Sequence, residues 1–186
     1  MERTLSLDAS TTCIGWSVWD KDDLISYGKI TPTIKKLEWR DRLRNFTPQI
    51  CSLIKDYKIT DMIIEDVPLM KKGGLKTLVQ LGAVQGMVIG ICDSFGVELS
   101  FKSVAEWRKD IGLHDGTKDG MKRDLLKQYS IEKANKMFGL QLTFVSASST
   151  LNDDDISDSI LLYASTRDKY KVVPKTFGRK RKVVDK

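Results

Sequence analysis

The chain has 186 residues, of which 41 % are hydrophobic, and this is enough for one compact domain with an ordinary core. Its three widely spaced cysteines exclude a disulfide framework and a zinc site, and they predict reduced thiols in a cytoplasmic protein. A signal peptide and a membrane partner are not expected, since the sequence shows no signal pattern and no unbroken apolar run long enough to span a bilayer.

The net charge of +6 is placed unevenly along the chain. Residues 169–186 carry eight Lys and Arg side chains against Asp185, which gives +7 and leaves −1 for the rest. A near-neutral body with a basic end is typical of proteins with a polyanionic partner, although a solvated tail without a specific role is the alternative. We expect a folded domain over residues 1–168 and a flexible basic tail over residues 169–186.

The first third of the sequence predicts an antiparallel meander. Residues 3–9, 14–20 and 24–31 are apolar or alternating and are separated by turn-forming residues. A helix is expected to start at a cap on Thr33 and to run to about residue 54, with Pro48 kinking or dividing it. Residues 60–66 then predict a buried strand, and a strand that follows a helix implies a crossover to a parallel neighbour.

The remaining sequence continues with alternating helices and one more strand. Residues 75–95 have helical spacing, and residues 97–101 predict the fifth strand. Ser103 and Glu106 have the spacing of a capping box at the start of a short helix. Residues 118–138 predict a basic helix, and a last helix runs from Asn152 or Asp153 to about residue 169. The predicted fold is an α/β domain with a mixed five-stranded sheet, an antiparallel meander followed by parallel strands, and helices on both faces.

Four acidic residues lie where packing does not explain them. Asp8 ends the first strand, Glu65 ends the fourth, and Asp155 and Asp158 are three residues apart on one face of the last helix. If they converge, their repulsion requires cations, and carboxylate oxygens favour Mg²⁺ or Mn²⁺. Two such ions about 3.5–4 Å apart are the usual device for attack of water on a phosphodiester.

Simpler explanations exist for single members of this set. The acidic run before the last helix is favoured by the helix dipole, and for Asp153 and Asp154 this is the preferred interpretation. Glu65 alone would also fit a salt-bridged residue at a strand end. Asp158 lies a full turn inside the helix, so capping does not account for it.

The same positions resemble a known family. Residues 7–10 followed by Gly15 and Trp16, residues 63–65 and residues 155–160 are similar, in order, to the motifs of the RuvC-type Holliday junction resolvases of the ribonuclease H-like superfamily. Residues 81–86 resemble that family's helix after the fourth strand, and the size and composition resemble a phage-encoded member.

The resemblance implies a homodimeric, Mg²⁺-dependent crossover junction endodeoxyribonuclease of DNA recombination and repair, acting in the cytoplasm of a host cell. Each active site would hold two metal ions on Asp8, Glu65, Asp155 and Asp158, with Mn²⁺ as a substitute. Lys118 would be a further catalytic residue that stabilises the transition state or the leaving group. Nothing in the sequence identifies a helicase partner.

Further residues are candidates for contacts with branched DNA. The family has an aromatic wedge in the loop after the fourth strand, where this chain has Leu69 and Met70, which could also unstack a base step. Phosphate contacts are expected from basic residues, with the aromatic Trp107 beside them, and a solvated surface is the alternative for each. These basic residues are Lys71, Lys72, Lys76, Arg108, Lys109, Lys118 and Lys122.

Gly82, Gly86 and Gly90 recur every four residues in the predicted helix over residues 75–95. Each glycine costs a helix about 1 kcal/mol, so the stripe requires a compensating role. Close packing on the sheet is one interpretation, and a dimer interface, which the resemblance favours, is the other.

Other functions compete with junction cleavage. A ribonuclease H-type nuclease acting on RNA–DNA hybrids would use the same carboxylates without a dimer. A non-catalytic protein that binds branched DNA would keep the basic tail, but the four intact carboxylates disfavour it. A sugar kinase or actin-like ATPase is disfavoured because 186 residues are too few for the two lobes of that fold.

Overall fold

A five-stranded mixed sheet forms the centre of the structure, a computed structural model that describes residues 2–34, 36–67, 74–113, 123–146 and 148–172. The strand order is β3-β2-β1-β4-β5. The first three strands pair antiparallel, and β4 and β5 run parallel to β1, so the predicted meander and crossover are confirmed. The strands are β1 (Arg3–Ala9), β2 (Ile14–Asp20), β3 (Asp23–Ile30), β4 (Asp61–Glu65) and β5 (Glu98–Lys102).

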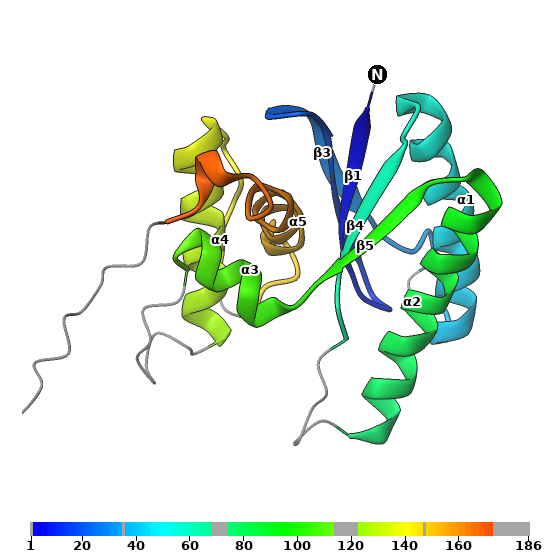
Figure 1. Ribbon diagram of the computed structural model, residues 1–186. Coiled ribbons are helices and arrows are strands. Elements are labelled where there is room, and N and C mark those ends of the chain that lie inside the picture. The colour runs from blue at the N-terminus through cyan, green and yellow to red at the C-terminus, as the bar shows by residue number, and fades with distance from the viewer. Residues whose placement is uncertain (1, 35, 68–73, 114–122, 147, 173–186) are drawn as a thin grey trace, which may run out of the picture.

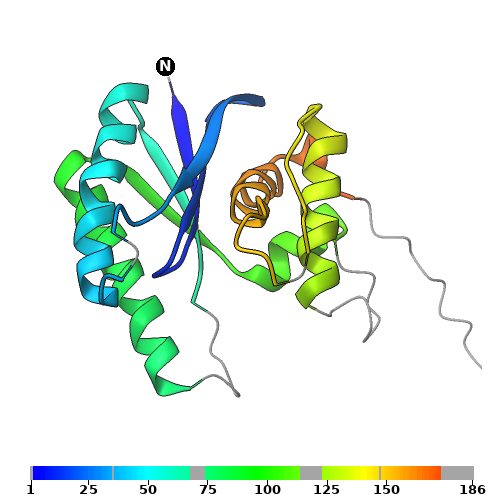
Figure 2. The same cartoon turned by 180° about the vertical axis from the view of Figure 1, so that it is seen from behind.

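Helices cover both faces of this sheet, as predicted (Figures 1 and 2). Helices α1 (Trp39–Tyr57) and α2 (Leu75–Phe95) lie on one face. Helices α3 (Val104–Ile111), α4 (Arg123–Phe138) and α5 (Asp154–Ala164) lie on the other.

Alternation along the strands divides the buried apolar residues into two cores. Leu5 and Leu7 pack with α1 and α2 in one core. Trp19 and Ile63 pack with α3, α4 and α5 in the other. The sheet therefore separates two helical layers, each with its own apolar contacts.

Helix α1 begins later than predicted and is not divided. The side chain of Glu38 accepts a hydrogen bond from the backbone N–H of Arg40 at 3.0 Å, so Glu38 caps the helix and the prediction for Thr33 is wrong. Pro48 lies inside a continuous 19-residue helix. An internal proline costs about 3 kcal/mol. Burial of three large apolar side chains of α1 on the sheet contributes roughly 1.5–3 kcal/mol each, which outweighs that cost.

The last helix ends earlier than predicted, at Ala164, and the chain turns back through a 3₁₀ turn over Asp168–Tyr170. The Tyr170 hydroxyl donates to the carbonyl of Asp22 at 3.0 Å, and the Val172 N–H donates to the carbonyl of Asp110 at 2.8 Å. Residues 169–172 of the expected tail therefore pack on the body. The rest of that tail, residues 173–186, lies outside the described residues.

Helix α2 exposes an apolar stripe. Leu75 is 76 % exposed and Val79 is 53 % exposed, although both are large and apolar. A Cβ built at Gly82, Gly86 or Gly90 would meet nothing within 4 Å, so the interpretation that these glycines serve close packing on the sheet is wrong. By length and composition α2 is also apolar enough to cross a bilayer, contrary to the expectation from the sequence. Core helices of soluble proteins can be equally long and apolar, so this property alone is weak evidence for a membrane span.

Candidate active site

Asp8 and Glu65 lie at the ends of neighbouring parallel strands. The register pairs Leu7 of β1 with Ile64 of β4, so the next residue on each strand is one of these two carboxylates. Leu7 belongs to the core under α1 and α2. Asp8 therefore points to the opposite face of the sheet, which α5 covers.

Gly15 allows α5 to approach this point closely. It pairs with Asp8 in the β1–β2 ladder. A Cβ at Gly15 would lie 1.9 Å from the backbone oxygen of Asp155, so only glycine lets the start of α5 lie directly on β2. This contact places Asp155, and Asp158 one turn later, over the end of β1.

The four carboxylates are close enough to affect one another's charge. Burial raises the pKa of Asp8 well above its ordinary value, and the charges of Glu65, Asp158 and Asp155 raise it further, while Arg108 partly offsets them. Burial also raises the pKa of Glu65 to about 7, with Asp158 as the largest charged contributor. Ionisation of this group of carboxylates at neutral pH is therefore unfavourable without a compensating positive charge.

The two helical carboxylates have different partners. Burial raises the pKa of Asp158 to about 6, although Arg108 and a hydrogen bond from Ser130 oppose the rise. Burial also raises the pKa of Asp155, and a hydrogen bond with Cys13 opposes that shift. Burial and the charge of Asp155 raise the pKa of the Cys13 thiol, which keeps this thiol neutral.

Helices α3 and α4 supply hydrogen-bond donors to the site. The indole N–H of Trp107 donates to Glu65 Oε1 at 2.6 Å, and Arg108 Nη2 lies 3.3 Å from Asp158 Oδ2. The hydroxyl of Ser130 donates to Asp158 Oδ1. Trp107 is fully buried, so this aromatic side chain does not lie on the surface beside the basic residues. The capping box at Ser103 predicted the start of α3, but neither the hydrogen bond of Trp107 nor that of Ser130 has a sequence signal.

The candidate metal ligands have the chemistry that a hard divalent cation prefers. They are buried carboxylates that repel one another, and among the residues that the structure describes Asp8 has no hydrogen-bond donor. As the side chains are placed, no three acidic, cysteine or histidine side chains in the described ranges are arranged to hold a metal ion. Binding of an ion would therefore require some of these side chains to turn towards it.

The predicted DNA-binding residues are only partly described. Arg108 is partly buried against Asp158, whereas Lys76 on the first turn of α2 and Lys109 on α3 are exposed. Lys127, another basic residue, pairs with Asp154 at 2.6 Å. The others lie outside the described residues, and these are Leu69, Met70, Lys71, Lys72, Lys118 and Lys122.

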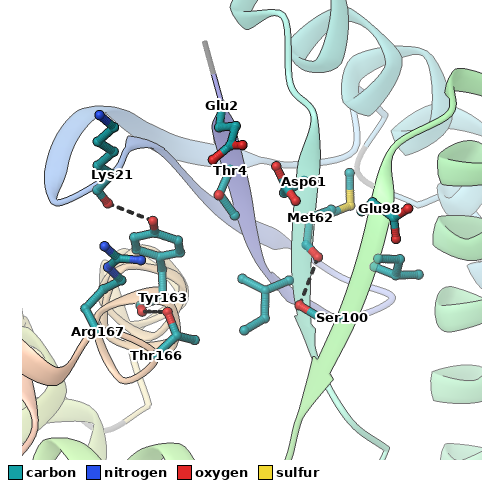
Figure 3. A pocket seen from close by; sticks show the side chains of 12 residues that line it. Glu2, Thr4, Lys21, Asp61, Met62, Glu98, Ser100, Tyr163, Thr166 and Arg167 are labelled. Atoms are coloured by element: carbon teal, nitrogen blue, oxygen red, sulfur yellow. Dashed lines mark hydrogen bonds between the residues drawn. The ribbon is translucent and has the colours of Figure 1, made fainter.

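A cavity of about 570 Å³ lies at the other end of the sheet, where β1, β4 and β5 begin (Figure 3). Acidic side chains from these strands, among them Asp61 and Glu98, line one side, and Lys21 and Arg167 line the other. None of the four candidate carboxylates lines this cavity. It is therefore distinct from the candidate active site.

No family model and no curated protein matches the sequence. Solved structures do match the fold. Thermus thermophilus RuvC, solved in complex with a Holliday junction substrate, has a TM-score of 0.61 at 11 % identity and covers 92 % of this chain and 100 % of its own.

Two further resolvases match with slightly lower scores. The fowlpox virus resolvase in complex with Holliday junction DNA has a TM-score of 0.52 at 13 % identity, covering 88 % of this chain and 95 % of its own. The yeast mitochondrial Holliday junction resolvase Ydc2 has the same TM-score at 10 % identity, covering 88 % and 78 %. The chain therefore has the fold of the RuvC-type Holliday junction resolvases, as its sequence motifs predicted.

Proposed function

We propose that this protein is an endonuclease that resolves four-way and related branched DNA junctions by metal-dependent hydrolysis of phosphodiester bonds. The observation that carries the proposal is that the ends of β1 and β4 and the start of α5 bring four carboxylates within electrostatic reach of one another. The match to resolvases over nearly the whole chain supports junction DNA as the substrate.

The four carboxylates would hold two Mg²⁺ ions, with Mn²⁺ as a substitute. Asp8, whose charge interacts with those of the other three, would be a ligand of both ions, Glu65 and Asp158 would each hold one, and Asp155 would complete the set or orient water. The bound ions would supply a water nucleophile and neutralise charge on the phosphate. The protein's own contribution is to keep these oxygens together in a partly buried site.

We further propose that the protein acts as a homodimer through α2. The helix exposes Leu75 and Val79 on the side where Gly82, Gly86 and Gly90 leave space for another backbone. An exposed apolar stripe of this kind is typical of an interface. A two-fold dimer would present two active sites to a substrate that needs two symmetrical cuts.

Exposed basic residues would bind the DNA backbone. Lys76 and Lys109 are exposed and free to contact phosphate, and Lys118 would act at the leaving group as the resemblance implies. Arg108 would contact phosphate after leaving Asp158. The basic residues at 173–186 would add affinity without sequence preference.

The experiment that tests the proposal compares four substrates with and without Mg²⁺. These are a synthetic four-way junction, a linear duplex, a flap and an RNA–DNA hybrid. We expect cleavage of the junction only with Mg²⁺, and we expect Asp8→Asn to bind the junction without cutting it. The control is Asp61→Asn, an acidic residue at the opposite end of the neighbouring strand, which should cut normally.

Each alternative has its own outcome in this assay. Preferential cleavage of the RNA strand in the hybrid would identify a ribonuclease H-type enzyme. Junction binding without cleavage of any substrate would identify a non-catalytic binding protein. Cleavage by Asp8→Asn would remove Asp8 from the mechanism.

A further inference from the structure

Trp107 combines complete burial with a short hydrogen bond to a candidate ligand. Its side chain is 0 % exposed, and its indole N–H lies 2.6 Å from Glu65 Oε1. A hydrogen bond from a neutral donor to a carboxylate is shorter and stronger than a neutral pair. Among the described residues, this is the side-chain hydrogen bond that the Glu65 carboxylate receives.

The position of this donor is fixed by its surroundings. The capping box of Ser103 and Glu106 sets where α3 begins, directly after β5, and Trp107 follows in the first turn. The ring packs in the core with Ile63 of β4 and with α5. An indole has only two side-chain torsions, so a packed ring holds its N–H in one place.

Trp107 also contacts Arg108, the basic residue that pairs with Asp158. The guanidinium carbon of Arg108 lies 5.0 Å from the centre of the Trp107 ring, within cation–π range. Arg108 in turn pairs with Asp158 at 3.3 Å. Trp107 and Arg108, which are consecutive in α3, therefore contact Glu65 and Asp158 respectively. The Trp107 ring also packs against the Arg108 guanidinium.

We propose that Trp107 is a positioning residue that holds one oxygen of Glu65 and so leaves the other oxygen directed to a divalent cation. The inference rests on the proposed function, because it assigns a role in metal binding. A glutamate has three side-chain torsions, and ordering it on binding costs free energy that a fixed partner removes beforehand. Partners of metal ligands are generally worth 10- to 100-fold in metal affinity.

The test measures Mn²⁺ affinity by electron paramagnetic resonance of the free ion, without any cleavage assay. Trp107→Phe keeps a buried ring and removes the donor, and we expect about tenfold weaker binding. The matched control is Trp19→Phe. Trp19 is also 0 % exposed, and its indole N–H donates to Ser17 Oγ at 2.9 Å, so its replacement should leave affinity within about twofold of the wild type.

A double-mutant cycle distinguishes positioning from a general loss of structure. If Trp107 acts through Glu65, then Trp107→Phe should weaken Mn²⁺ binding no further in a Glu65→Gln background. Equal losses in both backgrounds would overturn the inference. Should Trp107→Phe fail to fold, the indole N–H resonances of the wild type serve instead, and that of Trp107 should move on Mg²⁺ addition while that of Trp19 stays.

The inference and the proposed function fail in different ways. Wild-type affinity in Trp107→Phe, or an unmoved Trp107 resonance in a protein that binds Mg²⁺, would overturn the inference alone. Absence of any Mn²⁺ binding by the wild type would overturn both.

Discussion

Glu65→Gln should stabilise the metal-free protein at pH 8 although it removes a candidate metal ligand. The amide keeps an oxygen that can accept the hydrogen bond from Trp107, and it carries no charge. The Glu65 carboxyl, in contrast, has its pKa raised from 4.5 to about 7 by burial and by the charge of Asp158. Its ionised form is therefore disfavoured in the folded protein.

The size of the effect follows from proton linkage. Because the pKa is higher in the folded state, Glu65 contributes stability that is fully present below about pH 4.5 and is lost as the pH rises through about 7. At 1.36 kcal/mol per pH unit, the loss by pH 8 is roughly 3 kcal/mol. In a chain of this length, that corresponds to a change in Tm of about 6–12 °C.

The assay is thermal unfolding from pH 4.5 to pH 8 in EDTA and again in Mg²⁺. In EDTA the Tm of Glu65→Gln should match the wild type at pH 4.5 and exceed it increasingly towards pH 8. Mg²⁺ should raise the Tm of the wild type at pH 8, where the carboxylates ionise, and should raise that of the variant much less. A variant less stable than the wild type at pH 8 in EDTA would refute the reasoning.

Other changes test the packing, the helix surface and the charges separately. Gly15→Ala should lower the Tm by several degrees in circular dichroism melts and weaken Mn²⁺ binding, because its Cβ meets Asp155 O at 1.9 Å; an unchanged Tm would contradict the close contact. Light scattering should give twice the mass of one chain, and Gly86→Glu should halve it; a wild-type monomer would exclude α2 as an interface. Deleting residues 173–186, which carry six basic side chains against one acidic one, should weaken junction binding and flatten its dependence on salt, and an unchanged slope would assign them no role. Arg108→Ala should lower the Tm in EDTA at pH 8 by about 4–8 °C, from roughly 2 kcal/mol, and Mg²⁺ should restore it; no loss in EDTA would show that the ion pair is not stabilising.

The sheet could be predicted because its signals are local. Alternating apolar residues specified the first three strands, and an apolar run ending in Glu65 specified β4. The carboxylates were identifiable because a charge at the end of a buried strand, or a turn inside an apolar helix, has no packing role. These signals need only the spacing within one segment.

The sequence predictions were wrong or incomplete where contacts between distant segments determine the structure. The cap of α1 is Glu38 and not Thr33, because Thr33 pairs with Asn45 instead, its hydroxyl accepting from the Asn45 side-chain amide at 3.0 Å. The hydrogen bond between Trp107 and Glu65 joins residues that are 42 apart in the chain. Hydrogen bonds of this kind leave no periodicity in the sequence, so only the packed structure reveals them.

The partition of the core by the sheet has a practical consequence. If the chain associates through the exposed face of α2 and binds ions at the carboxylates, replacements on that face should change association while leaving ion affinity intact, and an engineered single-subunit form could be used to titrate the carboxylates in isolation. Gln85 is the exception to this separation, since its side-chain amide donates to the Glu65 carbonyl at 3.1 Å from within α2. A shift of α2 on association would be transmitted there to the strand that carries Glu65.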